Sequence, residues 1–158
     1  MRIGHGYDVH RFKDGNEITI GGVKIPHDKA LLAHSDGDVL IHAIADALLG
    51  ALGERDIGVL FPDNDAKYEN IDSKLLLDAV RALMDSKGFE IEYIDSTIIA
   101  QAPKMSPHIE SMRIALANVL KIDVSRINIK ATTEEKLGFT GRKEGIASHA
   151  VCLLKEKA

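Results

Sequence analysis

The chain has 158 residues, of which 45% are hydrophobic and 28% charged, and its net charge is −4 at pH 7. This length is typical of one compact domain, and no segment approaches the run of about 20 apolar residues that a membrane helix needs. The negative charge and the 4% aromatic content argue against a nucleic-acid-binding protein, which needs a basic surface and stacking rings. We therefore expect a single domain over residues 1–158, without a disulfide because Cys152 is the only cysteine.

The first predicted element is a strand over residues 2–12, joined to a second strand at 17–25 by a turn in "KDGN". Since strand side chains alternate between two faces, Asp8 and His10 lie on the same face as two glycines. The strand pattern begins at once and leaves no room for a secretory or transit segment, so a cytoplasmic protein is expected.

The remaining segments read in order as two helices, a strand, a helix and two strands. The first of these helices has Ser35 and Asp36 as candidate N-caps, and the third helix begins at Ser106 and Pro107. The expected ranges are 38–52 and 72–88 for the first two helices, 92–100 for a strand, 106–120 for the third helix, and 126–131 and 145–155 for the closing strands.

These elements predict an α+β fold, an α/β sandwich with a mixed β-sheet and about three helices on one face. The other face would expose strand residues such as Ile98, Val151 and Leu153. Association with further copies of the chain is the ordinary way to cover such a surface.

A metal site is predicted where the first strand meets the first helix. Residues i and i+2 of a strand point to the same side, so Asp8 and His10 can converge on one ion. In the helix, Asp38, His42 and Asp46 recur every four residues and form one polar stripe on an otherwise apolar segment. Two histidines and a carboxylate with an open fourth position suit catalytic Zn²⁺, with Asp38 or Asp46 holding the other nitrogen of His42.

The same donor set leaves two alternatives. It matches the two-histidine, one-carboxylate group of non-haem iron oxygenases, which predicts bound iron and O₂ consumption. The residues also fit a structural role, in which Asp8 and His10 bond a neighbouring turn and His42 is a hydrogen-bonded core residue.

Two later stretches suit a phosphate ligand. In "KATTEEKLGFTGR", the spacing of Thr132 and Glu135 predicts a capping box that opens a helical turn, whose free N–H groups would bind an anion. Glu135 would hold Mg²⁺ bridging phosphates, and Thr132 and Thr133 would add hydroxyl donors. "AQAPKMSPH" places Lys104 in a loop after a strand, where ligands bind in such sheets. A nucleotide-binding module without catalysis would use these stretches and leave the metal site idle.

Two further loops lie near these groups in the sequence. "AHSDGD" brings His34 and Ser35 directly before the metal helix, close to any ligand of the ion. "DIGVLFPDND" carries three aspartates, which suit either a solvated turn or a hydroxyl-binding loop.

Five motifs together resemble the 2-C-methyl-D-erythritol 2,4-cyclodiphosphate synthases of the non-mevalonate isoprenoid pathway, nearly end to end. They are "GHGYDVHRF", "LLAHSDGDVLIHAIADALLGA", "DIGVLFPDND", "TIIAQAPKM" and "ATTEEKLGFTGRKEGIA". The resemblance implies a bacterial, cytoplasmic homotrimer, with its sheets packed around the trimer axis and its active sites between subunits. It implies a metal-dependent lyase that converts 4-diphosphocytidyl-2-C-methyl-D-erythritol 2-phosphate to the 2,4-cyclodiphosphate and CMP.

The resemblance also assigns the site residues. The implied Zn²⁺ ligands are Asp8, His10 and His42. Glu135 is the implied Mg²⁺ or Mn²⁺ ligand, and His34 and Thr133 are the implied transition-state stabilisers. The implied substrate-binding residues are Ser35, Asp56, Ile57, Gly58, Phe61, Pro62, Asp63, Asn64, Asp65, Thr132, Phe139 and Arg142. The implied nucleotide-binding residues, from the neighbouring subunit, are Ala100, Gln101, Ala102, Pro103, Lys104, Met105, Ser106 and Ala131.

In this family, Phe139 and Arg142 would lie near a central trimer channel where isoprenoid diphosphates bind. Three positions in the same region depart from the pattern common among relatives: Tyr7, Ser148 and His149. A histidine in place of an acid at position 149 changes the local charge of that channel.

Overall fold

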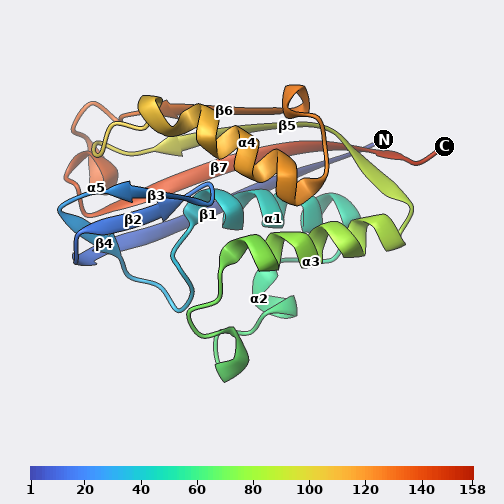
Figure 1. Ribbon diagram of the computed structural model, residues 1–158, viewed down its shortest axis with the longest axis horizontal. Helices are drawn as coiled ribbons and strands as arrows, with labels where there is room; N and C mark the ends of the chain where they lie inside the picture. The colour runs from blue at the N-terminus through green and yellow to red at the C-terminus, as the bar shows by residue number, and fades with distance from the viewer.

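The computed structural model describes residues 1–158 and has a five-stranded sheet at its centre (Figure 1). The strand order is β4-β1-β7-β5-β6, and every neighbouring pair is antiparallel except β5 with β6. A second, two-stranded sheet is formed by β2 and β3. The strands are β1 (Arg2–Asp14), β2 (Glu17–Ile20), β3 (Val23–Pro26), β4 (Lys29–Leu31), β5 (Phe89–Ile99), β6 (Ile127–Thr132) and β7 (Gly145–Glu156). The predicted α+β fold with a mixed sheet is confirmed.

Three long helices lie on one face of the sheet, as predicted (Figure 1). α1 packs directly on β1 and β7, α3 packs on α1, and α4 packs on β6. The helices are α1 (Val39–Leu52), α2 (Ile57–Leu60), α3 (Ser73–Ser86), α4 (Ile109–Leu120) and α5 (Gly138–Gly141), with 3₁₀ helices η1 (Ala66–Tyr68), η2 (Ser106–His108) and η3 (Val124–Arg126). None of them is both long and apolar enough to span a membrane.

The predicted hairpin between the first two strands is wrong. The segment 17–25 is itself a hairpin, because Gly21 and Gly22 take positive φ values of 60° and 74° and form its turn. Their N–H groups donate to the Asp38 carboxylate at 2.8 and 2.7 Å, which fixes this hairpin over the start of α1. β1 pairs instead with β4 and with the C-terminal strand β7.

Asp38, and neither Ser35 nor Asp36, is the N-cap of α1, since its carboxylate accepts the Ile41 N–H at 3.0 Å. Likewise Ser106 does not cap the third helix: residues 106–108 form η2, and α4 begins at Ile109.

The sheet face away from the helices is only partly covered. Ile3 is 72% exposed, and Tyr7 and Val151 are 43% and 40% exposed. Leu153 is half-buried there, but Ile98 was predicted for the wrong face: it is fully buried on the helix side, as the last inward-facing residue of β5. On the open face His5 Nε2 lies 2.9 Å from His149 Nδ1.

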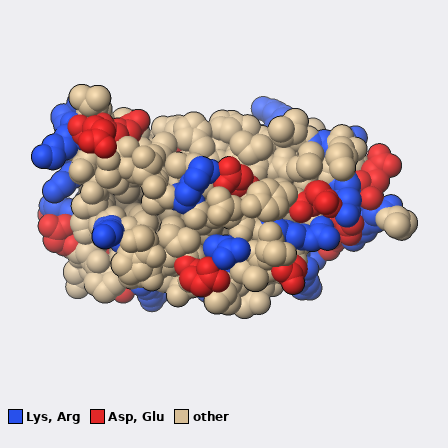
Figure 2. All heavy atoms as spheres, turned by 90° about the horizontal axis from the view of Figure 1, so that it is seen from above, with Lys and Arg blue, Asp and Glu red and all other residues tan.

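Figure 2 shows another side of the molecule, where cationic and anionic side chains are interspersed and form no continuous basic patch.

Candidate metal centre and adjoining cavities

The close approach of α1 to β1 brings the predicted metal ligands together. A Cβ atom at Gly4 would lie 1.9 Å from the Ala47 carbonyl oxygen, and one at Gly6 would lie 1.8 Å from that of Ala43. Only glycine therefore fits at these inward positions of β1. Because side chains alternate along a strand, Asp8 and His10 lie on the same face of β1 as these glycines, opposite His42 of α1.

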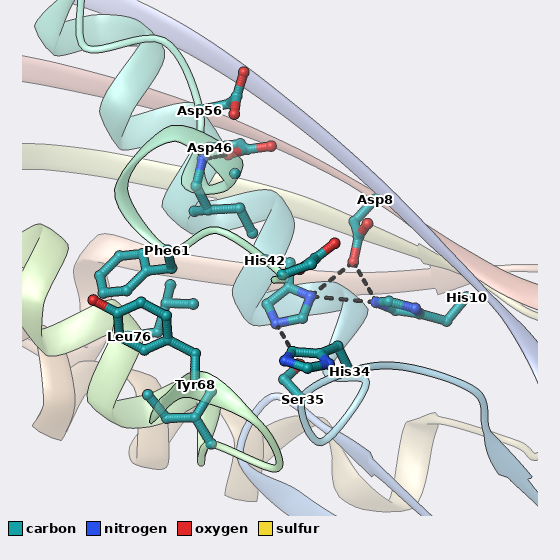
Figure 3. A pocket seen from close by; sticks show the side chains of 14 residues that line it. Asp8, His10, His34, Ser35, His42, Asp46, Asp56, Phe61, Tyr68 and Leu76 are labelled. Carbon is teal, nitrogen blue, oxygen red and sulfur yellow. Dashed lines mark hydrogen bonds and ion pairs between the residues drawn. The ribbon is translucent and has the colours of Figure 1, made fainter. Parts of the chain in front are cut away.

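The three predicted zinc ligands converge in space. Asp8 Oδ2 lies 2.9 Å from His10 Nε2 and 2.9 Å from His42 Nδ1, and the two nitrogens are 3.3 Å apart (Figure 3). One donor atom from each residue lies within 4.8 Å of the other two. Two imidazole nitrogens and one carboxylate oxygen are a donor set that suits Zn²⁺ or a comparable divalent transition metal. The residues present thus fit a metal ion.

The remaining ring nitrogens have partners of their own. His10 Nδ1 lies 3.2 Å from the Leu32 carbonyl oxygen, which fixes Nε2 toward the site. His42 Nε2 lies 2.9 Å from Ser73 Oγ and 3.3 Å from Ser35 Oγ. The expectation that Asp38 or Asp46 holds this nitrogen is wrong: Asp38 caps α1, and Asp46 accepts the Ile57 N–H at 2.8 Å.

Burial and close contacts shift the pKa values of three groups at this site. Burial alone would raise the pKa of Asp8, but hydrogen bonds and charge from His10 and His42 outweigh it and lower that pKa to about 2. Burial opposes protonation of His42, yet its contact with Asp8 and nearby carboxylates raise its pKa above the usual 6.5. Burial raises the pKa of Asp38 to about 6 against its backbone N–H donors. An ionised carboxylate beside two imidazole groups therefore favours the binding of a cation.

A cavity of about 280 Å³ opens beside the three donors. Figure 3 shows Asp8, His10 and His42 at one end and Asp46 and Asp56 at another. Of the residues expected to bind substrate or stabilise the transition state, those that line it are His34, Ser35, Asp56, Ile57, Gly58, Phe61 and Asp63. Three expected residues of the same loop do not line it: Pro62, Asn64 and Asp65, of which Asp65 caps η1 by accepting the Lys67 N–H.

Sequence reasoning missed three further lining residues, Tyr68, Ile71 and Leu76. They form the apolar side of the cavity, where the Tyr68 ring contacts Phe61 edge-on at 5.2 Å between centroids. Their signal was weak, because they lie in the link after the aspartate-rich loop and at the start of an amphipathic helix.

A second cavity, of about 390 Å³, shares no lining residue with the first. It is lined by nine of the residues expected at the nucleotide and phosphates: Ala100, Gln101, Pro103, Lys104, Met105, Ser106, Ala131, Thr132 and Thr133. Ala102 turns away and lines a different hollow. The stretches 100–106 and 131–136 are joined by the Ala100 N–H donating to the Thr132 carbonyl at 3.0 Å and by the Lys136 N–H donating to Gln101 Oε1 at 3.1 Å.

The predicted capping box does not form. Glu135 has φ of 55° and Lys136 has φ of 65°, so the chain turns where a helix was expected. Thr133 Oγ1 accepts the Glu135 N–H at 3.3 Å, a local turn that competes with the helical alternative. Neither Glu135 nor Phe139 nor Arg142 lines the two cavities; residues 131–139 are all exposed.

An α+β fold that holds an open group of two histidines and a carboxylate, with polar cavities for a ligand, defines a small-molecule enzyme with a candidate metal centre. A family model for the YgbB family matches residues 1–155. The chain belongs to this family, whose curated members are 2-C-methyl-D-erythritol 2,4-cyclodiphosphate synthases of the non-mevalonate isoprenoid pathway.

Individual relatives match nearly the whole length of this chain. The synthase of Pseudomonas entomophila is 62% identical over 154 residues, which is 98% of each chain. The Plasmodium falciparum IspF structure, a CDP complex, has a TM-score of 0.88 at 42% identity and is matched over 99% of this chain and 97% of its own. The bifunctional IspDF of Campylobacter jejuni has a TM-score of 0.94 at 45% identity, and the match spans 98% of this chain and 42% of that one.

Proposed function

We propose that residues 1–158 form one catalytic domain that converts 4-diphosphocytidyl-2-C-methyl-D-erythritol 2-phosphate to 2-C-methyl-D-erythritol 2,4-cyclodiphosphate and CMP. The observation that carries the proposal is the convergence of Asp8, His10 and His42 on one point at the edge of an open cavity. The names of the relatives supply the product, and two neighbouring structures with CDP support a cytidine-linked substrate.

The reaction is an intramolecular phosphoryl transfer. An oxygen of the 2-phosphate forms a bond to the β-phosphorus, and the bond from that phosphorus to the bridging oxygen breaks as CMP leaves with the electron pair. The attacking phosphate is already ionised at neutral pH, so no strong general base is required. Catalysis then depends on positioning and on neutralising charge, as in phosphoryl transfer generally.

The chain's own residues divide this work. Asp8, His10 and His42 would hold Zn²⁺, which when bound supplies a positive charge that orients and neutralises the attacking phosphate. His34 and Ser35 line the cavity next to this point and would donate hydrogen bonds to the phosphorylated tetritol. The Asp56 loop lies further along the same cavity and would bind the substrate's hydroxyl groups.

The second cavity would receive the cytidine diphosphate. Lys104, Thr132 and Thr133 offer a cation and two hydroxyls to the phosphates, with Thr133 stabilising the charge that builds up in the transition state. The Glu135 carboxylate is exposed and has no hydrogen-bond partner, and it would hold a Mg²⁺ or Mn²⁺ ion at the phosphates. Such an ion supplies charge neutralisation at the diphosphate.

Because the two cavities share no residue, we infer that a complete active site combines the first cavity of one subunit with the second cavity of its neighbour. The half-exposed sheet face around Ile3, Tyr7 and Val151 supports a homotrimer packed on this face. In that assembly Phe139 and Arg142 would line a channel for an isoprenoid diphosphate, although Arg142 here pairs with Glu144 at 2.7 Å. We place the enzyme in the bacterial cytoplasm.

The test is ³¹P NMR of the purified protein with the proposed substrate, Zn²⁺ and Mg²⁺. We expect CMP and the two resonances of a cyclic diphosphate to appear together and both to disappear after chelation. A folded, zinc-loaded protein that leaves the substrate intact would overturn the proposed activity. Iron loading with O₂ consumption would support the oxygenase alternative instead.

A further inference from the structure

A chain of hydrogen bonds runs from His42 away from the candidate metal centre and ends at Asp36. His42 Nε2 lies 2.9 Å from Ser73 Oγ, and the Ser73 hydroxyl lies 2.5 Å from Asp36 Oδ1. Ser73 is fully buried and His42 is 5% exposed, so water does not compete for the bond between them, whereas Asp36 is partly exposed. The Ser73 N–H also donates to Asp36 Oδ2 at 2.9 Å, and the Asp38 N–H donates to Asp36 Oδ1 at 3.1 Å.

The direction of every bond in this chain is set by its carboxylate end. An ionised carboxylate can only accept, so the Ser73 hydroxyl must give its single hydrogen to Asp36. Ser73 Oγ is then left with lone pairs alone toward His42, and it can only accept there. His42 must therefore donate from Nε2–H, which is the tautomer that leaves the Nδ1 lone pair free for a metal ion.

We propose that Asp36 and Ser73 are positioning residues that set the tautomer and ring orientation of His42 for metal binding. The inference rests on the proposed function in one respect, namely that the Asp8, His10 and His42 group binds a divalent ion. The general effect of removing such a partner from a metal-bound histidine is a loss of about 10–100-fold in metal affinity or activity.

The same two residues connect the metal centre to the cavity wall. Ser73 is the first residue of α3, directly after the segment that carries Phe61, Tyr68 and Ile71 along the cavity. Asp36 lies in the loop before α1 and holds the Ser73 backbone as well as its hydroxyl. The ring of His42 is thus aligned by the contact that joins the starts of α1 and α3.

The test measures zinc affinity by competition with a chromophoric chelator, on full-length Ser73→Ala and Asp36→Asn proteins. Ser73→Ala removes the acceptor of the Nε2 hydrogen and leaves only Ser35 Oγ, at 3.3 Å, as a substitute. Asp36→Asn keeps the shape, but either orientation of the amide sets an N–H group against a backbone N–H. We expect zinc affinity to fall about 10–100-fold in Ser73→Ala and about tenfold or more in Asp36→Asn.

Ser86→Ala is the matched control, because Ser86 lies at the other end of α3 and bonds only the Leu83 carbonyl. It should bind zinc like the wild type. A second measurement follows the His42 Nε2–H resonance in ¹⁵N-edited NMR spectra of the zinc-loaded proteins. The resonance should be shifted downfield and protected from exchange in the wild type, and should lose both properties in Ser73→Ala.

The outcomes separate the two proposals. If His42→Ala abolishes zinc binding while Ser73→Ala and Asp36→Asn bind zinc within twofold of the wild type, the positioning role is wrong and the metal site stands. If His42→Ala itself keeps its zinc, the metal site is wrong and the positioning role falls with it. Should Ser73→Ala not fold, Asp36→Asn and the wild-type resonance still decide the question.

Discussion

Two regions carry the predicted chemistry, and they differ in how completely one chain builds them. Around His42, each ring nitrogen and each carboxylate has a named partner, and the group is sheltered between α1, β1 and α3. Along residues 131–139, every residue is exposed, and the hydroxyls bond only their own backbone neighbours. The candidate metal centre is therefore already organised within one chain, whereas residues 131–139 have few contacts that fix their side chains.

The largest effect should come from breaking the organised end. In His42→Ala we expect both stoichiometric zinc and turnover to be lost, with turnover falling on the order of 10³-fold, because one of three ligands to the neutralising charge is gone. Zinc content by elemental analysis and CMP release measure the two effects. Full activity with zinc retained would contradict the ligand assignment.

At the exposed end, Thr133→Ala should lower turnover about 10²-fold, the typical loss of one donor to a developing negative charge. Zinc content and thermal stability should stay at the wild-type level, since the Thr133 hydroxyl accepts only the nearby Glu135 N–H. Loss of zinc in this variant would contradict the prediction, because it would show that residues 131–139 and the metal centre are not independent.

A third prediction concerns the contact that organises the metal end. Gly6→Ala places a Cβ atom 1.8 Å from the Ala43 carbonyl oxygen, so α1 must move away from β1. We expect a loss of about 1–3 kcal/mol in unfolding free energy, together with weaker zinc binding. Gly50→Ala, whose Cβ would meet nothing closer than 3.8 Å on an exposed part of α1, should instead stabilise by about 0.5–1 kcal/mol. Equal effects in denaturant titrations would rule out the proposed role of the close approach.

The smallest effect is a pH dependence confined to the metal end. The pKa of His42 is raised in the metal-free fold, so its pairing with Asp8 stabilises the protein fully below pH 6.5 and this contribution is lost as pH rises through the raised pKa. Zinc must displace the same proton, so its affinity should show the opposite trend and fall up to about tenfold per pH unit on acidification below that pKa. Asp8, with its pKa near 2, stays ionised throughout this range. Melting curves of the metal-free protein and chelator competition, each from pH 6 to 8, test the two signs.

Spacing within single elements was enough to predict that these donor side chains meet, while the resemblance to the synthase family favoured a metal site over a structural role. The i, i+2 pair Asp8 and His10 and the inward stripe of the first helix place three donors correctly, since strand and helix periodicity fix which side chains share a face. The partner of His42 Nε2 could not be found in this way. Ser73 and Asp36 are 37 residues apart, and locally both look like helix caps, which is the commoner use of such residues.

Local sequence patterns also gave wrong predictions where tertiary contacts determine the backbone conformation. The segment 17–25 looks like one strand, but Asp38 binds the N–H groups of Gly21 and Gly22 and folds it into a hairpin of its own. The Thr132 to Glu135 spacing looks like a capping box, but Thr132 stays in β6 and Glu134 instead bonds Thr140 of α5. The long helices and the central strands were predictable because their apolar patterns extend over many residues.

The pairing of β1 with β7 has a consequence for the order in which the protein is made. Asp8 lies opposite Ser148 and His10 opposite Ile146, so the strand with two of the three donors is flanked by a segment that is synthesised much later than β1. A nascent chain that ends before residue 145 lacks this neighbour, and its first strand has only the three-residue β4 to pair with. Zinc should thus be captured only after residues 145–156 have paired with β1, and a chain shortened to residue 144 should not retain it in a chelator assay.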